Sequence, residues 1–268
     1  MNFLRALWAF LVRDFQTEVS YRLAFLMQFF GLFVSSTLWF FMARFIGPKD
    51  PELLGGLGYF PWALAGLMVS RFLDVSLHVY AASIRTEQTT GTLEAMLVTP
   101  TRLASIVMAS SAFSFFFAAL QAILYLGFGM LFFGVRPNVG SVLGLFAAIF
   151  FTVIGMSGIG ILSAAFVLYF KRGNPIEFLI STASLLLGGV LIPPTVLGSK
   201  AAWLSEFVPT YHASEAVRDV LFRGKGIADT SHHLLALAAF AAVLVPVGLI
   251  GARIAVRRAK REGSLVQY

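Results

Sequence analysis

The stretch VLGLFAAIFFTVIGMSGIGILSAAFVLYF, from Val142 to Phe170, contains no Asp, Glu, Lys or Arg. A helix rises about 1.5 Å per residue, so about 20 apolar residues cross the roughly 30 Å of hydrocarbon in a bilayer. This stretch is therefore expected to be a membrane-spanning helix. The whole chain has the same character, since 58% of its residues are hydrophobic and 12% are charged. Soluble domains carry about 25% charged residues, so an ordinary soluble protein is excluded.

Six such stretches predict an all-α integral membrane protein, with residues 1–268 forming a single transmembrane domain. The first begins beyond residue 20 and follows Asp14 and Glu18, so it is expected to be a retained span and not a cleaved signal peptide. Cysteine is absent, which excludes disulfides and cysteine-ligated metal sites. The six predicted spans are Leu23–Ile46, Tyr59–Ile84, Leu103–Phe133, Val142–Phe170, Ile176–Leu197 and Leu234–Val256.

The positions of Lys and Arg predict the orientation, because cytoplasmic loops carry an excess of these residues. With both termini in the cytoplasm, twelve of the 20 Lys and Arg lie on the inner side and seven on the outer side, and Arg71 lies within a span. We therefore expect a multi-pass protein of the cytoplasmic (inner) membrane. The net charge of +7 is explained mainly by orientation, so nucleic acid is not an expected partner.

Residues 1–22 precede the first span and predict an amphipathic helix along the inner membrane surface. Two interpretations remain open, a connecting helix with a mechanical role and an ordinary flanking helix. The apolar residues recur at steps of three and four: Leu4, Leu7, Trp8, Leu11, Val12, Phe15 and Val19.

The stretch RTEQTTGTLEAMLVTPTR, from Arg85 to Arg102, interrupts the apolar sequence with polar residues. Gly91 permits a sharp turn, Thr92 can cap a helix and Pro100 can end it. Spacing alone fits a short helix that lies against lipid headgroups as well as one that contacts another protein. Glu94 falls in the first helical turn, and Leu93, Met96 and Leu97 form an apolar ridge.

This stretch resembles the signature cytoplasmic loop of type-2 ABC transporter permeases. The resemblance implies that residues 85–100 form a coupling loop whose helix docks in a cleft of a separate ATPase. LSEFVPTYHASEAVRDVLFRG (204–224) is similar to the family's segment between its fifth and sixth spans, and VRDF (12–15) resembles its N-terminal connecting helix, so the likeness covers essentially the whole chain. The implied ATPase-coupling residues are Glu87, Gly91, Thr92, Leu93, Glu94, Met96, Leu97 and Pro100.

The resemblance implies the permease subunit of an ATP-driven exporter, working as a homodimer or with a closely related permease, together with two ATPase chains. The chain has no phosphate-binding Gly-x-x-x-x-Gly-Lys-Ser/Thr loop, because its one Gly-Lys pair, Gly224-Lys225, is followed by Gly226. It is therefore not expected to be an enzyme, and ATP and Mg²⁺ are expected on the partner. Short outer loops suit a substrate recognised within the membrane, such as a lipid, a lipid-linked glycan or an amphiphilic drug.

The second span contains Arg71, Asp74 and His78, whose spacing places them on one helical face. Ionisable residues within a bilayer usually pair and face protein or water. The stripe is either a contact surface for substrate or a neutralised pair that fixes helix packing, with Asp74 able to hold both Arg71 and His78. It also supports an alternative function, an ion- or proton-coupled secondary transporter, and a non-transporting assembly protein is a third possibility.

For the segment between the last two spans, the family resemblance implies an outer gate. Pro193-Pro194 should break the helix, and residues 199–224 should return as two short helices around Pro209, with Arg218 in the second. This segment is either a re-entrant gate or a surface-lying loop anchored by aromatic residues.

Three histidines lie near the predicted outer mouth, but no metal site is expected there. His232 and His233 are neighbours and should point away from one another on a helix, while His212 lies in the preceding segment. The GMSGIG stretch, 155–160, predicts close helix packing, with a hinge as the alternative.

Overall fold

The computed structural model describes residues 3–46, 54–89, 103–170 and 175–261, and no strand occurs among them. This confirms the all-α prediction. The long helices are α1 (Phe3–Ser20), α2 (Arg22–Ile46), α3 (Tyr59–Thr89), α5 (Leu103–Phe133), α6 (Val142–Phe170) and α10 (Ser231–Arg261). The shorter elements are α7 (Pro175–Leu187), the 3₁₀ turn η2 (Pro194–Leu197), α8 (Ser199–Ser205) and α9 (Pro209–Leu221).

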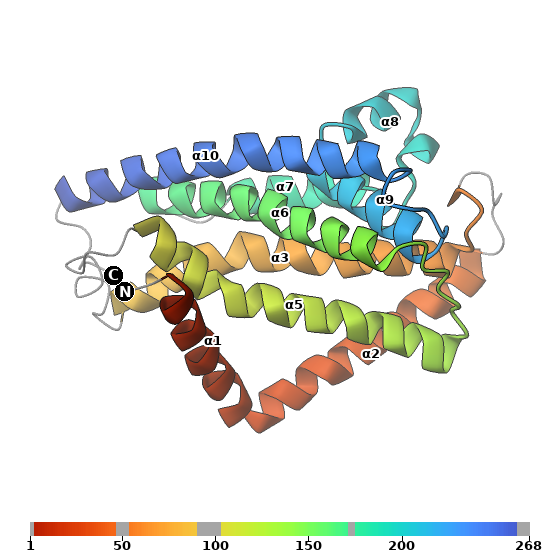
Figure 1. Cartoon of the computed structure of the whole chain (residues 1–268), viewed down its shortest axis with the longest axis horizontal. Helices are drawn as coiled ribbons and strands as arrows, with labels where there is room; N and C mark the ends of the chain where they lie inside the picture. Colours follow the sequence, from red (N-terminus) through yellow and green to blue (C-terminus); the bar gives the residue numbers. More distant parts are fainter. Residues whose placement is uncertain (1–2, 47–53, 90–102, 171–174, 262–268) are drawn as a thin grey trace.

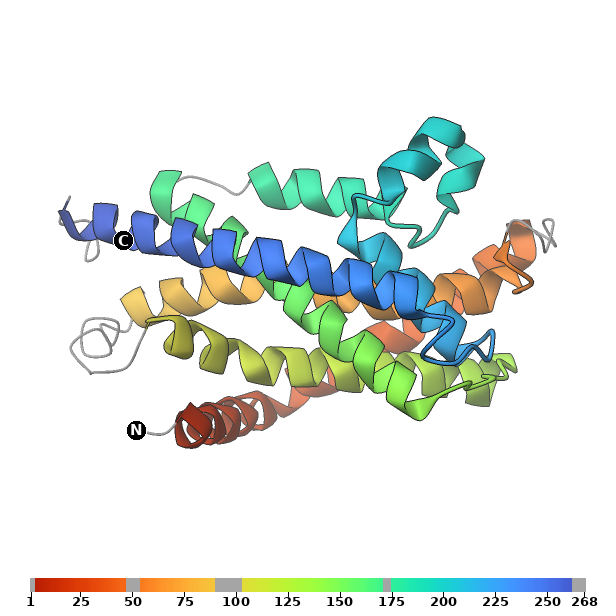
Figure 2. The ribbon, with the colours of Figure 1, turned by 45° about the horizontal axis from the view of Figure 1, so that its top comes forward.

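Helices α3, α5, α6 and α10 run along the length of a bundle with α3 at its centre (Figures 1 and 2). Helix α3 contacts α5, α6, α9 and α2, and α6 makes its most extensive contact with α10. In the membrane-length part of α3 72% of residues are buried, against 11% in α2. The apolar side chains of α2 are therefore available to lipid or another subunit, whereas those of α3 form the core.

Small residues permit the close packing of α6 on both sides. A Cβ atom on Gly158 would lie 2.6 Å from Cβ of Leu244 in α10, and one on Gly160 would overlap the backbone carbonyl oxygen of Ser76 in α3. The Ser76 hydroxyl donates a hydrogen bond to the carbonyl of Met156. These contacts agree with the packing interpretation of the GMSGIG stretch, because backbones can approach this closely only where side chains are absent or small.

Five helices of the described chain are long and apolar enough to cross a membrane, and they lie within α2, α3, α5, α6 and α10. The fifth predicted span, Ile176–Leu197, is not one helix. Helix α7 has 13 residues, about 20 Å of rise, which is short of the roughly 30 Å of hydrocarbon. It ends at Leu187, and Gly189, two residues later, has a φ of +61°, in the left-handed region that favours glycine.

The physical reason for this break is contact with α9. A Cβ on Gly188 would overlap both the carbonyl of Ser184 and the hydroxyl of Thr210 in α9. The helix therefore ends six residues before Pro193, where the sequence predicts the break. Carbonyl groups freed by the break find donors elsewhere, for example the Tyr59 hydroxyl, which donates to Leu191 at 2.9 Å.

Helix α9 is largely buried among α3, α6 and α10. This contradicts the surface-lying interpretation for residues 209–221, whereas Trp203 of α8 is 64% exposed. The loop after α5 also holds α9, because the amides of Asn138 and Gly140 donate to its last carbonyls at 2.9 Å.

Helix α1 is inclined to the long helices and lies against α5 (Figure 1). The rings of Phe15 and Phe113 meet edge to face, with their centroids 6.5 Å apart, while Trp8 is 69% exposed. The predicted apolar face of α1 thus packs partly against α5 and is partly exposed.

The beginnings of α1 and α5 and the ends of α3, α6 and α10 gather at one end of the bundle (Figure 1). The beginnings of α3 and α10 lie at the other end. This arrangement places both described termini of the chain, the end of α3 and the beginning of α5 on the same side.

Candidate functional site

The predicted ATPase-coupling residues lie at and beyond the end of α3. Glu87 is within this helix, although its side chain is outside the described part. Gly91, Thr92, Leu93, Glu94, Met96, Leu97 and Pro100 fall in residues 90–102, outside the described residues. The docking helix therefore stays a prediction.

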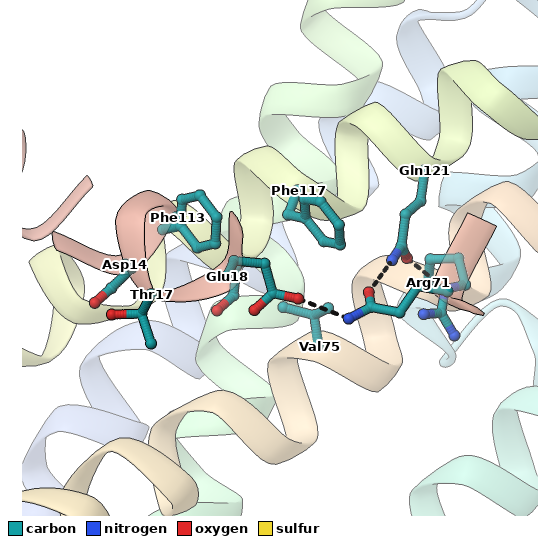
Figure 3. A pocket seen from close by; sticks show the side chains of 10 residues that line it. Asp14, Thr17, Glu18, Arg71, Val75, Phe113, Phe117 and Gln121 are labelled. Atoms are coloured by element: carbon teal, nitrogen blue, oxygen red, sulfur yellow. Dashed lines mark hydrogen bonds between the residues drawn. The ribbon is translucent and has the colours of Figure 1, made fainter. Parts of the chain in front are cut away.

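A chain of polar side chains joins four helices inside the bundle (Figure 3). Nε of Arg71 in α3 donates to Oε1 of Gln121 in α5 at 2.9 Å. Nε2 of Gln121 donates to Oε1 of Gln28 in α2 at 3.3 Å, and Nε2 of Gln28 donates to Oε1 of Glu18 in α1 at 2.6 Å. The predicted Arg71–Asp74 pair is confirmed, with Nη1 and Oδ2 separated by 3.6 Å.

This polar chain borders a cavity of about 400 Å³ between α1, α2, α3 and α5 (Figure 3). Phenyl rings and polar groups share its wall, so it could receive a molecule with both apolar and polar parts. The lining residues are Asp14, Thr17, Glu18, Gln28, Arg71, Val75, Phe113, Ser114, Phe117 and Gln121.

His78 does not bind the Asp74 carboxylate, and this part of the prediction is wrong. Its Nδ1 lies 2.7 Å from the backbone carbonyl oxygen of Asp74, and its Nε2 lies 2.8 Å from Oε1 of Glu177 in α7. A neighbouring helix thus supplies the carboxylate, which sequence spacing could not indicate.

Asp74 borders a second cavity, of about 320 Å³, between α3, α7 and the segment after α7. Its side chain is 49% exposed. The Arg71–Asp74 pair therefore lies between two cavities, one on each side of α3. Arg71 joins α3 to α5 through Gln121, while Arg71 lines the first cavity and Asp74 the second.

Arg218, predicted in the outer gate, is fully buried and binds three elements together. Its Nε and Nη2 both donate to the carbonyl of Trp62 in α3 at 3.1 Å, and Nη2 donates to the carbonyl of Gly189 at 2.5 Å. Its Nη1 donates to Oε1 of Glu215 at 2.7 Å. The guanidinium also lies over the Trp62 ring, 3.8 Å from the centroid. We call these contacts the Arg218 clasp.

Further charges of α9 and the loop after it extend the clasp. Glu215 and Asp219 both bind Arg223 at 2.7 Å, and Asp219 also binds Lys225 at 3.0 Å. Burial alone would raise the pKa of the Glu215 carboxyl, but the charges and hydrogen bonds of Arg218 and Arg223 outweigh it and lower that pKa to about 2. Glu215 is therefore ionised at neutral pH, as a partner of two guanidinium groups.

The three predicted gate prolines have separate local roles. Pro193 precedes η2, and the buried Pro194 begins it. Pro209 is buried at the first position of α9, where its missing N–H removes no helical hydrogen bond. These prolines shape the return of the chain after α7, while the contact with α3 is made by Arg218.

The outer histidines come together, contrary to the prediction. Nδ1 of His212 in α9 lies 3.1 Å from Nδ1 of His233, and the ring centroids of His232 and His233 are 5.3 Å apart. His232 and His233 lie in the first turn of α10, and His212 lies in the first turn of α9, which packs beside it. This tertiary contact decides their directions.

Sequence reasoning missed several members of these sites. Gln28 and Gln121 are isolated amides within strongly apolar spans, and that signal could have identified them. Trp62, Glu177 and Glu215 lack such a signal, because their roles depend on partners far away in the sequence.

Comparison with known proteins gives one family. The model described as ABC-2 type transporter matches residues 2–222. No match was found among curated proteins. The family match confirms the resemblance to type-2 ABC permeases and covers every span except α10. The chain therefore belongs to the ABC-2 type transporter family and is a multi-pass membrane permease subunit of an ABC transporter.

Proposed function

We propose that this permease is the membrane-spanning subunit of an ATP-driven exporter that moves a lipid, a glycan or an amphiphilic drug-like molecule across the cytoplasmic membrane. A separate ATPase binds ATP and Mg²⁺ and docks on residues 85–100, and the permease itself has no nucleotide site. Family membership favours ATP over an ion gradient as the energy source, which disfavours the secondary-transporter alternative.

The observation that carries the proposal is the continuity of α3. This one helix of 31 residues runs from Tyr59, beside the Arg218 clasp, to Thr89, next to the proposed docking loop. It passes the Arg71–Asp74 pair on the way. A displacement of its inner end by the ATPase therefore reaches both cavities and the outer end without crossing a flexible joint.

The two cavities beside α3 support an amphiphilic substrate. The larger one combines the Phe113 and Phe117 rings with the Arg71 guanidinium and the Glu18 carboxylate. Such a wall suits a molecule whose polar group must be solvated while its apolar part stays in lipid. In this proposal Arg71 contacts the polar group of the substrate.

A dimer with the termini in the cytoplasm completes the proposal. Two observations support this orientation: the excess of basic residues predicted on the inner side, and the shared position of both described termini, the end of α3 and the beginning of α5 (Figure 1). The two cavities described in one chain have volumes of about 400 and 320 Å³, so a homodimer or a pair with a related permease, with two ATPase copies, would form the pathway.

The docking assignment is tested with Leu93→Asp, which places a charge on the proposed apolar ridge. The variant and the wild type are reconstituted in lipid vesicles with the ATPase that co-purifies with the wild type. We expect Leu93→Asp to lose at least about 90% of permease-stimulated ATP hydrolysis, because an interface core tolerates apolar exchange but not a buried charge.

Leu93→Met is the matched control, since it keeps the volume and apolar character of the ridge. It should retain stimulation within about twofold. Equal ATPase stimulation by the Asp and Met variants would contradict docking through this ridge, and failure of any ATPase to co-purify would contradict the exporter proposal as a whole.

A further inference from the structure

The outer end of the bundle gathers three histidines that the transport proposal does not use. His212 comes from α9, and His232 and His233 come from the first turn of α10. One nitrogen of each ring can be chosen so that all three lie within 4.8 Å of one another. We propose that these three imidazoles form a Zn²⁺ site, independent of the Arg71 cavity and of the ATPase.

The hydrogen bonding of His212 prepares one ligand atom. Its Nε2 lies 2.9 Å from the backbone carbonyl oxygen of Glu206, which can only accept a hydrogen bond, so this nitrogen carries the proton. In the neutral ring Nδ1 then has a free lone pair. A histidine that binds metal through one nitrogen usually donates from the other to a carbonyl or carboxylate, so His212 already has that arrangement.

The lone pair of His212 faces a second ligand. Nδ1 of His233 lies 3.1 Å away, so His233 donates to His212 when no ion is bound. Zn–N bonds of 2.0–2.1 Å in tetrahedral geometry place two ligating nitrogens about 3.4 Å apart. The observed separation is a few tenths of an ångström shorter. Moving the His233 proton to its Nε2 lets Zn²⁺ take the place of the shared proton.

His232 supplies the third nitrogen. Its side chain is 73% exposed, so its ring can turn toward the other two with little resistance from packing. The Glu206 carboxylate adds negative charge beside the cluster, since its Oε2 lies 3.5 Å from Nε2 of His212 and 3.8 Å from Nε2 of His232. Three neutral imidazoles beside a carboxylate favour a borderline divalent cation such as Zn²⁺.

The site would join two segments that are separate in the sequence. His212 is buried within α9, next to the segment that carries Glu206, whereas His232 and His233 belong to the last span. A bound ion would therefore fix the α8–α9 region to α10. The first turn of α10, which carries His232 and His233, lies at the end of the bundle opposite the end of α3 (Figure 1).

The test is a Zn²⁺ titration of the full chain in lipid nanodiscs, purified without a polyhistidine tag. The chain has four histidines, so His78→Ala is a matched control outside the cluster. We expect one Zn²⁺ per chain. His232→Ala and His233→Ala should each raise the Kd by at least about 100-fold and His78→Ala by less than about twofold, because even second-shell changes weaken metal sites 10–100-fold.

One further measurement separates ligation from folding. Co²⁺ should give the visible absorption of a tetrahedral site in the wild type and lose it in His232→Ala, an exposed position whose removal should leave the protein folded. A Kd unchanged within about twofold in both cluster variants would overturn the proposal. Equal loss of Zn²⁺ binding in His78→Ala, or the absence of stoichiometric binding, would also overturn it.

Discussion

Removal of the Arg218 side chain should release the segment that follows α7. Arg218 is fully buried, and it supplies donors to the carbonyls of Trp62 and Gly189 and to the Glu215 carboxylate. In Arg218→Met the apolar volume stays, but both carbonyls lose this donor and Glu215 keeps only Arg223. Breaking a buried ion pair costs about 3–5 kcal/mol, and we expect about 4 kcal/mol here. Arg218→Lys keeps the charge but loses the several N–H donors of the guanidinium and its stacking on Trp62. It should be destabilised by about half as much as Arg218→Met.

The absence of cysteine in the chain provides a local assay. Val190 follows Gly189 and is 3% exposed, so a cysteine in its place should be protected from maleimide. If labelling requires local opening, a loss of about 4 kcal/mol raises its rate by up to about 1,000-fold, since each 1.4 kcal/mol is tenfold. Labelling should be fastest with Met at position 218, slower with Lys and slowest with the wild-type Arg.

Lys200→Met is the control for charge removal, because Lys200 is exposed in α8. It should leave the labelling of Val190→Cys within about twofold of the wild type, as expected for a surface change. A labelling rate in Arg218→Met that also stays within this range, with an unchanged melting temperature, would refute the reasoning that the clasp holds the broken helix.

Three further predictions follow from the packing and the charges. Gly160→Ala should destabilise the bundle by about 2 kcal/mol in thermal unfolding, because its Cβ meets the Ser76 backbone, whereas Gly127→Ala, with no atom within 4 Å of the new Cβ, should not. The pKa of Glu215 is about 2 in the folded protein against 4.5 ordinarily. Its ionised form therefore adds about 3 kcal/mol to the free energy of unfolding above about pH 4.5, and this contribution is lost as pH falls toward 2. In Glu215→Gln the free energy of unfolding should change less with pH over that range. Arg71→Gln should lower transport at least about tenfold with normal ATPase binding if its charge contacts substrate; unchanged transport would leave it a packing role.

The sequence was sufficient for the long spans but not for the broken one. Apolar length identifies Leu103–Phe133 and Val142–Phe170 with the bounds that the structure has. The same measure fails at Ile176–Leu197. Glycine occurs in membrane helices and is not polar, so Gly188 and Gly189 do not interrupt the apolar stretch and its length gives no sign of the break. The break at Gly188 and Gly189 depends on the approach of α9, a contact between residues that local pattern cannot place.

The candidate sites divide in the same way. Arg71 and Asp74 are one helical turn apart, so spacing alone predicts their pair. His78 and Glu177 lie on different helices, and the histidines of α9 and α10 meet through the packing of helix ends. Tertiary structure determines these contacts, so a reading limited to one helix assigns them wrong partners or none.

The position of the Arg218 clasp has a consequence for leakage. Helix α3 spans about 46 Å at 1.5 Å per residue, with the clasp near its first turn and the proposed ATPase contact beyond its last. In the proposed exporter, closure on the far side would rely on the buried hydrogen bonds of the clasp, which lie far from the proposed nucleotide-binding partner. A variant with a weakened clasp should pass substrate down its gradient while the ATPase is idle, so resting permeability and powered transport are separable properties of this fold.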